Sequence, residues 1–184
     1  MKILAISGSL RDASYNTALL RAAAKLAPEG VELELWEGLK AVPPFDEDDE
    51  VNGVPAGAVE LHRAIAGADA LLFSTPEYNS SIPGVLKNAI DWASRPKASA
   101  PIRNKPAAVV GASTGMFGAV WAQAELRKVL ASAGARVLDG ELPVPASHTR
   151  FDADGRLNDD EIRERLAEIV KTLAGSAARD LAAV

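Results

Sequence analysis

The sequence predicts a doubly wound α/β domain, in which helices cover both faces of one parallel sheet. Strand-like and helix-like segments alternate along the whole chain, which is the pattern of consecutive βα units with right-handed crossovers. Residues 68–74 and 106–112 are predominantly apolar, as expected for central parallel strands that are buried on both sides. The length of 184 residues suits one domain with a sizeable core, so residues 1–184 are expected to fold as a single unit.

The first half of the chain supplies two strands and a helix. Residues 3–7 form a short apolar run that indicates the first buried strand, and apolar residues at helical spacing follow over 16–26. In residues 31–36, VELELW, apolar and acidic residues alternate: Val31, Leu33 and Leu35 lie on one side, and Glu32 and Glu34 lie on the other. Such alternation indicates a strand with one wet face, placed at a sheet edge. The acidic stretch FDEDDEVNG, residues 45–53, is expected to form a solvated loop.

The second half continues the alternation. Residues 82–94 place their apolar side chains on one helical stripe, and Pro83 suits the first turn of that helix. A further helix is expected over 117–132, and the segment ARVLDGEL, residues 135–142, is expected to supply a fifth strand. The last helix is expected to begin at Asn158 as N-cap, followed by a regular apolar stripe.

Composition excludes several classes of function. The net charge of −5 gives no electrostatic reason to expect nucleic acid or an anionic membrane as partner. Without cysteine, disulfides, thiol catalysis and thiolate metal sites are excluded. His62 is interpreted as a surface or packing residue, and His148 has no second histidine or cysteine at metal spacing, so no metal site is expected. No apolar run approaches the length of about 18 residues that a membrane span needs. The start, MKILAISGS, lacks the pattern of a signal peptide, so a cytoplasmic location is expected.

Polar side chains gather directly after the first strand, in GSLRDASYN, residues 8–16. A helix N-terminus offers free N–H groups and partial positive charge, which suit a phosphate. Ser9, Ser14 and Asn16 add short hydrogen-bonding groups, and Arg11 adds a forked cation. The residues alone leave open that Ser14 merely caps the helix and that Arg11 is a solvated loop residue. Neither a dinucleotide-binding glycine fingerprint nor a Walker A lysine loop follows this strand.

Two further loops follow predicted strands at the same edge of the sheet. PEYN, residues 76–79, places the flat face of Tyr78 among polar groups, which suits a planar ring with polar edges; a plain surface turn is the alternative. GASTGMFG, residues 111–118, offers backbone N–H groups and the hydroxyl of Ser113. A phosphate subsite, a ring subsite and a backbone clamp together describe a mononucleotide such as FMN better than a sugar or a metal.

Three motifs in the same order, GSLRDASYN, TPEYNSSIPGVLKNAIDW and GASTGMFG, resemble those of the NADPH-dependent FMN reductase family. That family includes quinone, chromate and azo-dye reductases. The resemblance covers most of the chain, and the later segment FDADGRL also fits. It implies a flavodoxin-like fold with a five-stranded parallel sheet of strand order 2-1-3-4-5. It also implies FMN as cofactor, NADPH or NADH as co-substrate, and hydride passing through flavin N5 to a quinone, a flavin or a similar small electron acceptor.

The resemblance further implies an assembly and a set of binding residues. The assembly is a homodimer or homotetramer in which a neighbouring chain borders the flavin. No catalytic side chain is expected, because the flavin carries the chemistry. The expected cofactor-binding residues are Ser9, Arg11, Ser14, Tyr15, Asn16, Thr17, Pro76, Glu77, Tyr78, Asn79, Ser113, Thr114 and Gly115.

Two other functions fit parts of the sequence. Gly111, Ser113 and Gly115 spell the nucleophile-elbow pattern of a serine hydrolase, and Asp139 and His148 follow in the chain order of such enzymes. However, only one more strand and helix follow, and this interpretation leaves the first two loops without a role. An electron carrier of the flavodoxin type would also bind FMN, but NAD(P)H alone would reduce it slowly or not at all.

Overall fold

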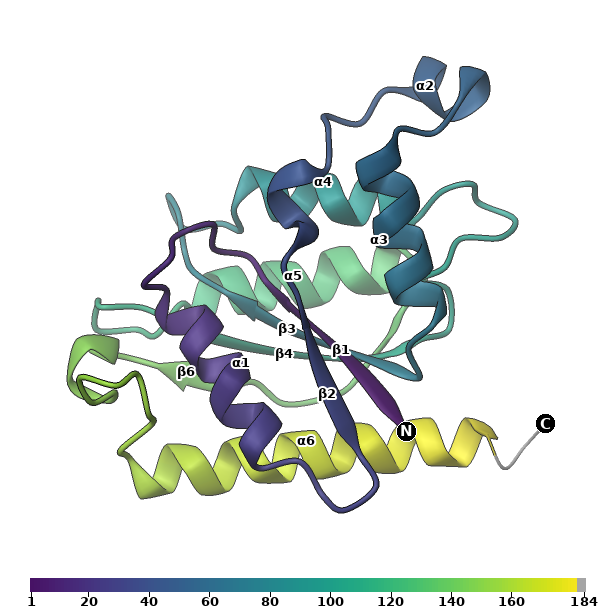
Figure 1. The fold of residues 1–184 in the computed structure, drawn as a ribbon. Helices are drawn as coiled ribbons and strands as arrows, with labels where there is room; N and C mark the ends of the chain where they lie inside the picture. Colours follow the sequence, from purple (N-terminus) through teal and green to yellow (C-terminus); the bar gives the residue numbers. More distant parts are fainter. Residues whose placement is uncertain (182–184) are drawn as a thin grey trace.

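The computed structural model describes residues 1–181 and shows one sheet between two layers of helices (Figure 1). The strands lie in the order β2-β1-β3-β4-β5, and β6 also pairs with β4. All these pairings are parallel, which confirms the predicted fold class and strand order. The strands are β1 (Lys2–Ser7), β2 (Glu32–Trp36), β3 (Ala70–Thr75), β4 (Pro106–Ala112), β5 (Arg136–Val137) and β6 (Pro143–Val144).

The burial of each strand follows its sequence pattern. Every residue of β3 and β4 is buried, because helices cover both faces of these central strands. At the edge, β2 pairs only with β1, and its Glu32 and Glu34 side chains are exposed, as the alternation in VELELW predicts. The sheet is therefore apolar at its centre and wet at the β2 edge.

Each face of the sheet has its own helices and its own apolar core. Side chains of α3, α4 and α5 pack on one face of β1, β3 and β4, and those of α1 and α6 pack on the other. Figure 1 shows these two groups of helices on opposite sides of the sheet. The helices are α1 (Tyr15–Lys25), α2 (Glu47–Asn52), α3 (Ala56–Ala66), α4 (Gly84–Ala93), α5 (Val120–Ser132) and α6 (Asp160–Leu181), with short 3₁₀ turns η1 (Gly38–Ala41) and η2 (Ser147–Thr149).

The predicted fifth strand over 135–142 is reduced to β5, and a second short strand, β6, follows the predicted range. Both pair with β4, but β5 ends at Val137 and β6 begins only at Pro143; Gly140 between them has a φ of +106°. Buried Gln123 accepts a hydrogen bond from Leu142 N (3.1 Å) where the chain returns to the sheet. A long-range side-chain contact therefore sets this interruption, and the local sequence pattern does not reveal it.

Other element boundaries also differ from prediction. Helix α4 begins at Gly84 because Pro83 has extended geometry, with ψ 138°, and Pro83 therefore precedes the helix. Helix α5 begins only at Val120, because Gly118 and Ala119 have φ values of +59° and +61°. The acidic segment 45–53, expected as loop, contains α2, none of whose residues is buried.

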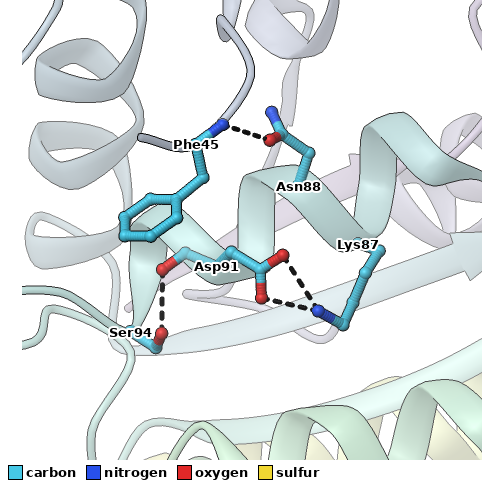
Figure 2. A network of polar contacts seen from close by, with 5 residues as sticks. All are labelled: Phe45, Lys87, Asn88, Asp91 and Ser94. Atoms are coloured by element: carbon cyan, nitrogen blue, oxygen red, sulfur yellow. Dashed lines mark hydrogen bonds and ion pairs between the residues drawn. The ribbon is translucent and has the colours of Figure 1, made fainter. Parts of the chain in front are cut away.

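The segment that leads into α2 is fastened to α4 (Figure 2). Phe45 N donates to Asn88 Oδ1 (2.7 Å), and the Phe45 ring meets Trp92 edge-on with centroids 4.9 Å apart. On the exposed side of α4, Lys87 Nζ binds both carboxylate oxygens of Asp91 at 2.6 and 2.9 Å. Helix α2 therefore projects from the body of the molecule (Figure 1) on a base that α4 holds in place.

Asp159, and not the predicted Asn158, caps α6. Asp159 Oδ1 accepts a hydrogen bond from Ile162 N (3.0 Å), and Asp159 Oδ2 pairs with Arg150 Nη1 at 2.6 Å. The bond from the Ile162 N–H and the neighbouring Arg150 cation hold the pKa of Asp159 below its ordinary value. The ionised carboxylate is thus the form that the folded chain favours.

We expect Asp159→Asn to lower the free energy of unfolding at neutral pH and to lose this effect in acid. Because the folded-state pKa of Asp159 is depressed, its ionised form stabilises the fold above the unfolded pKa, and this contribution disappears as pH falls through the folded pKa. Urea denaturation of both proteins between about pH 7 and about pH 3 measures the difference. A difference that does not shrink towards acid would contradict the assignment.

Candidate functional site

Three loops leave the carboxyl ends of β1, β3 and β4 and meet at one edge of the sheet. Strand β1 neighbours β3, and β3 neighbours β4. The chain after β1 passes to the α1 face, whereas the chains after β3 and β4 pass to the opposite face. The crossover direction therefore reverses between β1 and β3, and in open α/β sheets ligands bind at such a point.

The loop after β1 is organised by its own hydroxyl groups. Ser14 Oγ accepts from Thr17 N (3.3 Å) as the N-cap of α1, which confirms the capping interpretation. Thr17 Oγ1 donates to Ser7 Oγ (2.9 Å), and Ser9 N donates to the same oxygen at 3.3 Å. The Arg11 side chain is exposed, and its Nη2 donates to Ala13 O (2.8 Å). These bonds organise the loop directly before α1, whose first backbone N–H groups have no partner within the helix.

A cavity of about 300 Å³ opens beside this first loop. Its lining includes Arg11, Arg21 and Lys40, with Asp12 and Glu37 as the acidic members. Cations thus outnumber carboxylates here, although the chain as a whole carries a net charge of −5. The local charge and the helix N-terminus both favour an anion.

Asn16, on the first turn of α1, is buried, with an exposed fraction of 3%. Its Nδ2 donates to Ala112 O (2.9 Å), and its Oδ1 accepts from Ala112 N (2.9 Å) and Ser74 Oγ (2.8 Å). The side chain therefore joins α1 to the ends of β3 and β4. Its assignment as a cofactor contact stays a prediction, and the contacts that the structure shows are with the protein.

The PEYN segment forms a tight turn. Tyr78 N donates to Ser81 O (2.9 Å) and Ser81 N to Tyr78 O (3.1 Å). Between them Asn79 and Ser80 have φ values of +52° and +61°, as in the two-residue turns that match strand twist. This turn presents the Tyr78 side chain outward with 51% of its surface exposed, where its ring is accessible to a ligand.

Glu77 connects the second loop to the helix that follows the third. Its Oε2 accepts a hydrogen bond from Ala122 N (3.1 Å) in the first turn of α5. A carboxylate at this end of a helix satisfies a free N–H group and interacts favourably with the helix dipole. Pro76 directly before it is buried. The contact fixes the separation of the two loops.

The loop after β4 is held against the chain that follows β6. Ser113 Oγ accepts from Gly115 N (3.1 Å), while Ala146 N donates to Gly115 O and Ser147 N to Ser113 O, both at 3.0 Å. Thr114 and Gly115 are exposed at the tip of the loop. The backbone and the Ser113 hydroxyl thus reach the edge of the sheet on a supported loop.

Large apolar side chains border these loops and stay exposed. Met116 is 80% exposed, Phe117 55% and Trp121 49%, and the Phe117 and Trp121 rings meet edge-on at 4.8 Å. Together with Tyr78 they give the site an apolar rim. Contiguous exposed apolar side chains of this kind are typical of a surface that binds a ligand or another chain.

The nucleophile elbow of a serine hydrolase does not form. An elbow requires a sharp strand-to-helix turn at the serine, but α5 begins only at Val120. Asp139 pairs with Arg127 (3.4 Å), and His148 is exposed. Across the described part of the chain, no hydrogen bond joins Ser113, His148 and Asp139 to one another. The geometry therefore does not support a catalytic triad at Ser113.

Residues 1–181 contain neither a metal-binding cluster nor a membrane-spanning helix. No group of three or more His, Asp or Glu side chains in that range is arranged to hold a metal ion. No helix in the same range has the length and apolar character that crossing a membrane requires.

Similar proteins of known class are FMN reductases, quinone reductases and related flavoenzymes. The sequence model of the family described as NADPH-dependent FMN reductase matches residues 1–149. An NAD(P)H-dependent FMN reductase of Pseudomonas aeruginosa is 45% identical over 174 residues, which cover 94% of this chain and 93% of that protein. A 2-hydroxy-1,4-benzoquinone reductase of a Burkholderia species is 38% identical over 167 residues, 90% of each chain. The solved structure of the flavoenzyme NAD(P)H:(acceptor) oxidoreductase from Paracoccus denitrificans is similar with a TM-score of 0.87, at 34% identity over 97% of both chains.

Proposed function

The chain belongs to the NADPH-dependent FMN reductase family. On this basis we propose that its three loops bind FMN in an FMN-dependent NAD(P)H oxidoreductase. The chain is an enzyme of this class, since its relatives are FMN reductases and quinone reductases. The observation that carries the proposal is the convergence of the three motif loops at one edge of the sheet, beside the point where the crossover direction reverses.

The first loop is proposed to hold the FMN phosphate. The donor set fits a dianion: free N–H groups at the α1 N-terminus, the Ser9 hydroxyl, and the exposed guanidinium of Arg11, beside a cavity with an excess of cations. Ser14, Tyr15, Asn16 and Thr17 belong to the same proposed subsite through the helix start that they form.

The second and third loops are proposed to hold the flavin ring. Tyr78 offers an exposed aromatic face, and Pro76, Glu77 and Asn79 shape the turn that presents it. The third loop contributes Ser113, Thr114 and Gly115, whose backbone and hydroxyl groups suit the polar edge of the ring. FMN bound there would supply the redox chemistry, that is, transfer of hydride from NAD(P)H and of electrons on to an acceptor.

A small quinone is the proposed electron acceptor. Relatives named quinone reductase, including one from Pseudomonas putida that is 37% identical over 158 residues, support this class of substrate. The exposed apolar rim beside the loops suits a flat apolar molecule. A cytoplasmic location is part of this proposal, because NAD(P)H is supplied there.

A homodimer or homotetramer is proposed for the assembly. Met116, Phe117 and Trp121 leave much of their apolar surface exposed beside the site. Burying such surface against a second copy is favourable by roughly 25 cal/mol per Å², and it would place a neighbouring chain next to the flavin.

An anaerobic titration with NADPH, followed by the visible absorbance of the FMN-loaded protein, tests the function. We expect rapid bleaching that the addition of a quinone reverses. Tight FMN binding without bleaching by NADPH or NADH would instead identify an electron carrier. Failure to bind FMN at all would overturn the assignment of the three loops.

A further inference from the structure

The geometry points to Asn16 as a positioning residue that holds all three loops of the site in register, an inference that rests on the proposed FMN-binding function. Asn16 lies 96 residues from Ala112 and 58 residues from Ser74 along the chain. Its side chain nevertheless bonds to both. The residue thus connects the first turn of α1 with the ends of β3 and β4.

The amide of Asn16 acts on Ala112 as a neighbouring strand would. Its Nδ2 donates to Ala112 O, and its Oδ1 accepts from Ala112 N, both at 2.9 Å. The pair therefore satisfies the two main-chain groups of the last residue of β4, which a parallel strand would otherwise have to pair. Only a side chain with one donor and one acceptor in this geometry can do so.

The third bond fixes the orientation of the amide. Ser74 Oγ donates to Asn16 Oδ1 at 2.8 Å, so the oxygen faces two donors and the nitrogen faces a carbonyl. Ser74 is fully buried and Asn16 is 3% exposed. Hydrogen bonds in such a dry network are costly to break, because water cannot replace the lost partner.

Both partners of Asn16 lie at the ends of strands that lead into loops of the proposed site. Thr75 and Pro76 follow Ser74, and Ser113 follows Ala112. A shift of either strand end would move the ring contacts, and a shift of α1 would move the phosphate contacts. Asn16 therefore acts on the whole flavin through the protein, whereas a direct phosphate ligand would act on the phosphate alone.

The substitution Asn16→Asp tests this distinction, because it changes one NH₂ group to oxygen without changing shape. Ionised, the new side chain places an oxygen against Ala112 O and a buried charge at the centre of the network. We expect affinity for both FMN and riboflavin, measured by quenching of flavin fluorescence, to fall about 10- to 100-fold near neutral pH. Riboflavin lacks the phosphate, so a loss of riboflavin affinity reports on the ring subsite.

Acid should restore the binding of riboflavin to Asn16→Asp. Burial raises the pKa of a carboxyl group, and the neutral acid can donate to Ala112 O while its other oxygen accepts from Ala112 N. We expect the riboflavin affinity of the variant to approach that of the parent between about pH 8 and about pH 5. Riboflavin is used here because the FMN phosphate itself titrates in this range.

Two further variants give the experiment its controls. Arg11→Ala should weaken FMN but leave riboflavin unchanged, because its proposed contact is with the phosphate alone. Ser74→Ala removes one donor to Asn16 Oδ1 and should weaken both flavins, by about 2- to 10-fold; it carries the test if Asn16→Asp does not fold. Circular dichroism at each pH verifies folding.

The outcomes separate the inference from the proposed function. Parallel loss of both flavins with recovery in acid supports Asn16 as a positioning residue. Loss of FMN alone, with riboflavin unaffected, would make Asn16 a direct phosphate ligand and overturn the inference, as would unchanged affinity for both. A parent protein that binds neither flavin would instead refute the proposed function.

Discussion

Replacing Trp92 by alanine is expected to lower the free energy of unfolding by about 3–5 kcal/mol. Trp92 is a fully buried residue of α4 with an exposed fraction of 0%, and it packs in the core between α3, α4, α5 and the sheet. Its Nε1 also donates to Pro43 O at 2.9 Å. The substitution removes a large apolar volume and an anchor of the segment that leads to α2. Domains of this kind are stable by only about 5–15 kcal/mol, so the variant should be marginal.

Urea denaturation of two comparison variants separates the contributions at this position. Trp92→Phe keeps most of the apolar volume but has a smaller ring and no N–H donor. We expect a cost of about 1–3 kcal/mol from the smaller ring and the lost hydrogen bond to Pro43 O, although Asn88 Nδ2 still donates to that carbonyl at 2.8 Å. Val51→Ala, at a residue of α2 that is 81% exposed, should change stability by less than about 0.5 kcal/mol. Equal effects of Trp92→Ala and Trp92→Phe would show that the cavity contributes nothing.

The second large effect is expected at Gly118, where a side chain would collide with the neighbouring backbone. A Cβ at this position would lie 2.6 Å from Val144 N and 2.8 Å from Pro143 C, and the φ of Gly118 is +59°. The left-handed backbone costs a non-glycine residue about 1–2 kcal/mol, and the overpacking costs about 1–3 kcal/mol more. Gly118→Ala should therefore lower the free energy of unfolding by about 2–5 kcal/mol.

Gly155→Ala is the matched control for this prediction. Gly155 also has a positive φ, +72°, but a Cβ there would meet no atom within 4 Å. Its cost should be the backbone strain alone, about 1–2 kcal/mol. Since Gly118 ends the third loop, Gly118→Ala should also weaken FMN binding, and Gly155→Ala should not. Equal destabilisation by the two substitutions would show that β6 yields to the added methyl group.

Local patterns in the sequence determine the architecture and the location of the site. The apolar runs of β3 and β4 and the alternation of β2 depend on which faces are buried, and each is visible within a few neighbouring residues. The parallel order then requires the loops after β1, β3 and β4 to meet at one edge. The cap at Ser14 is equally local, since its partner Thr17 lies three residues away.

The tertiary structure alone decides the contacts that hold those loops in place. From the sequence alone, Asn16 is only a polar residue at the start of a helix. In the structure its hydrogen-bond partners are Ser74 and Ala112, which are distant in the chain. Glu77 likewise bonds to Ala122, 45 residues further on. The sequence by itself determined the fold and where the motif loops of the proposed site lie, because burial and turn chemistry are local. Which side chains hold the loops of the proposed site together was decided only by the tertiary structure, because folding brings donors and acceptors that are distant in the chain into contact.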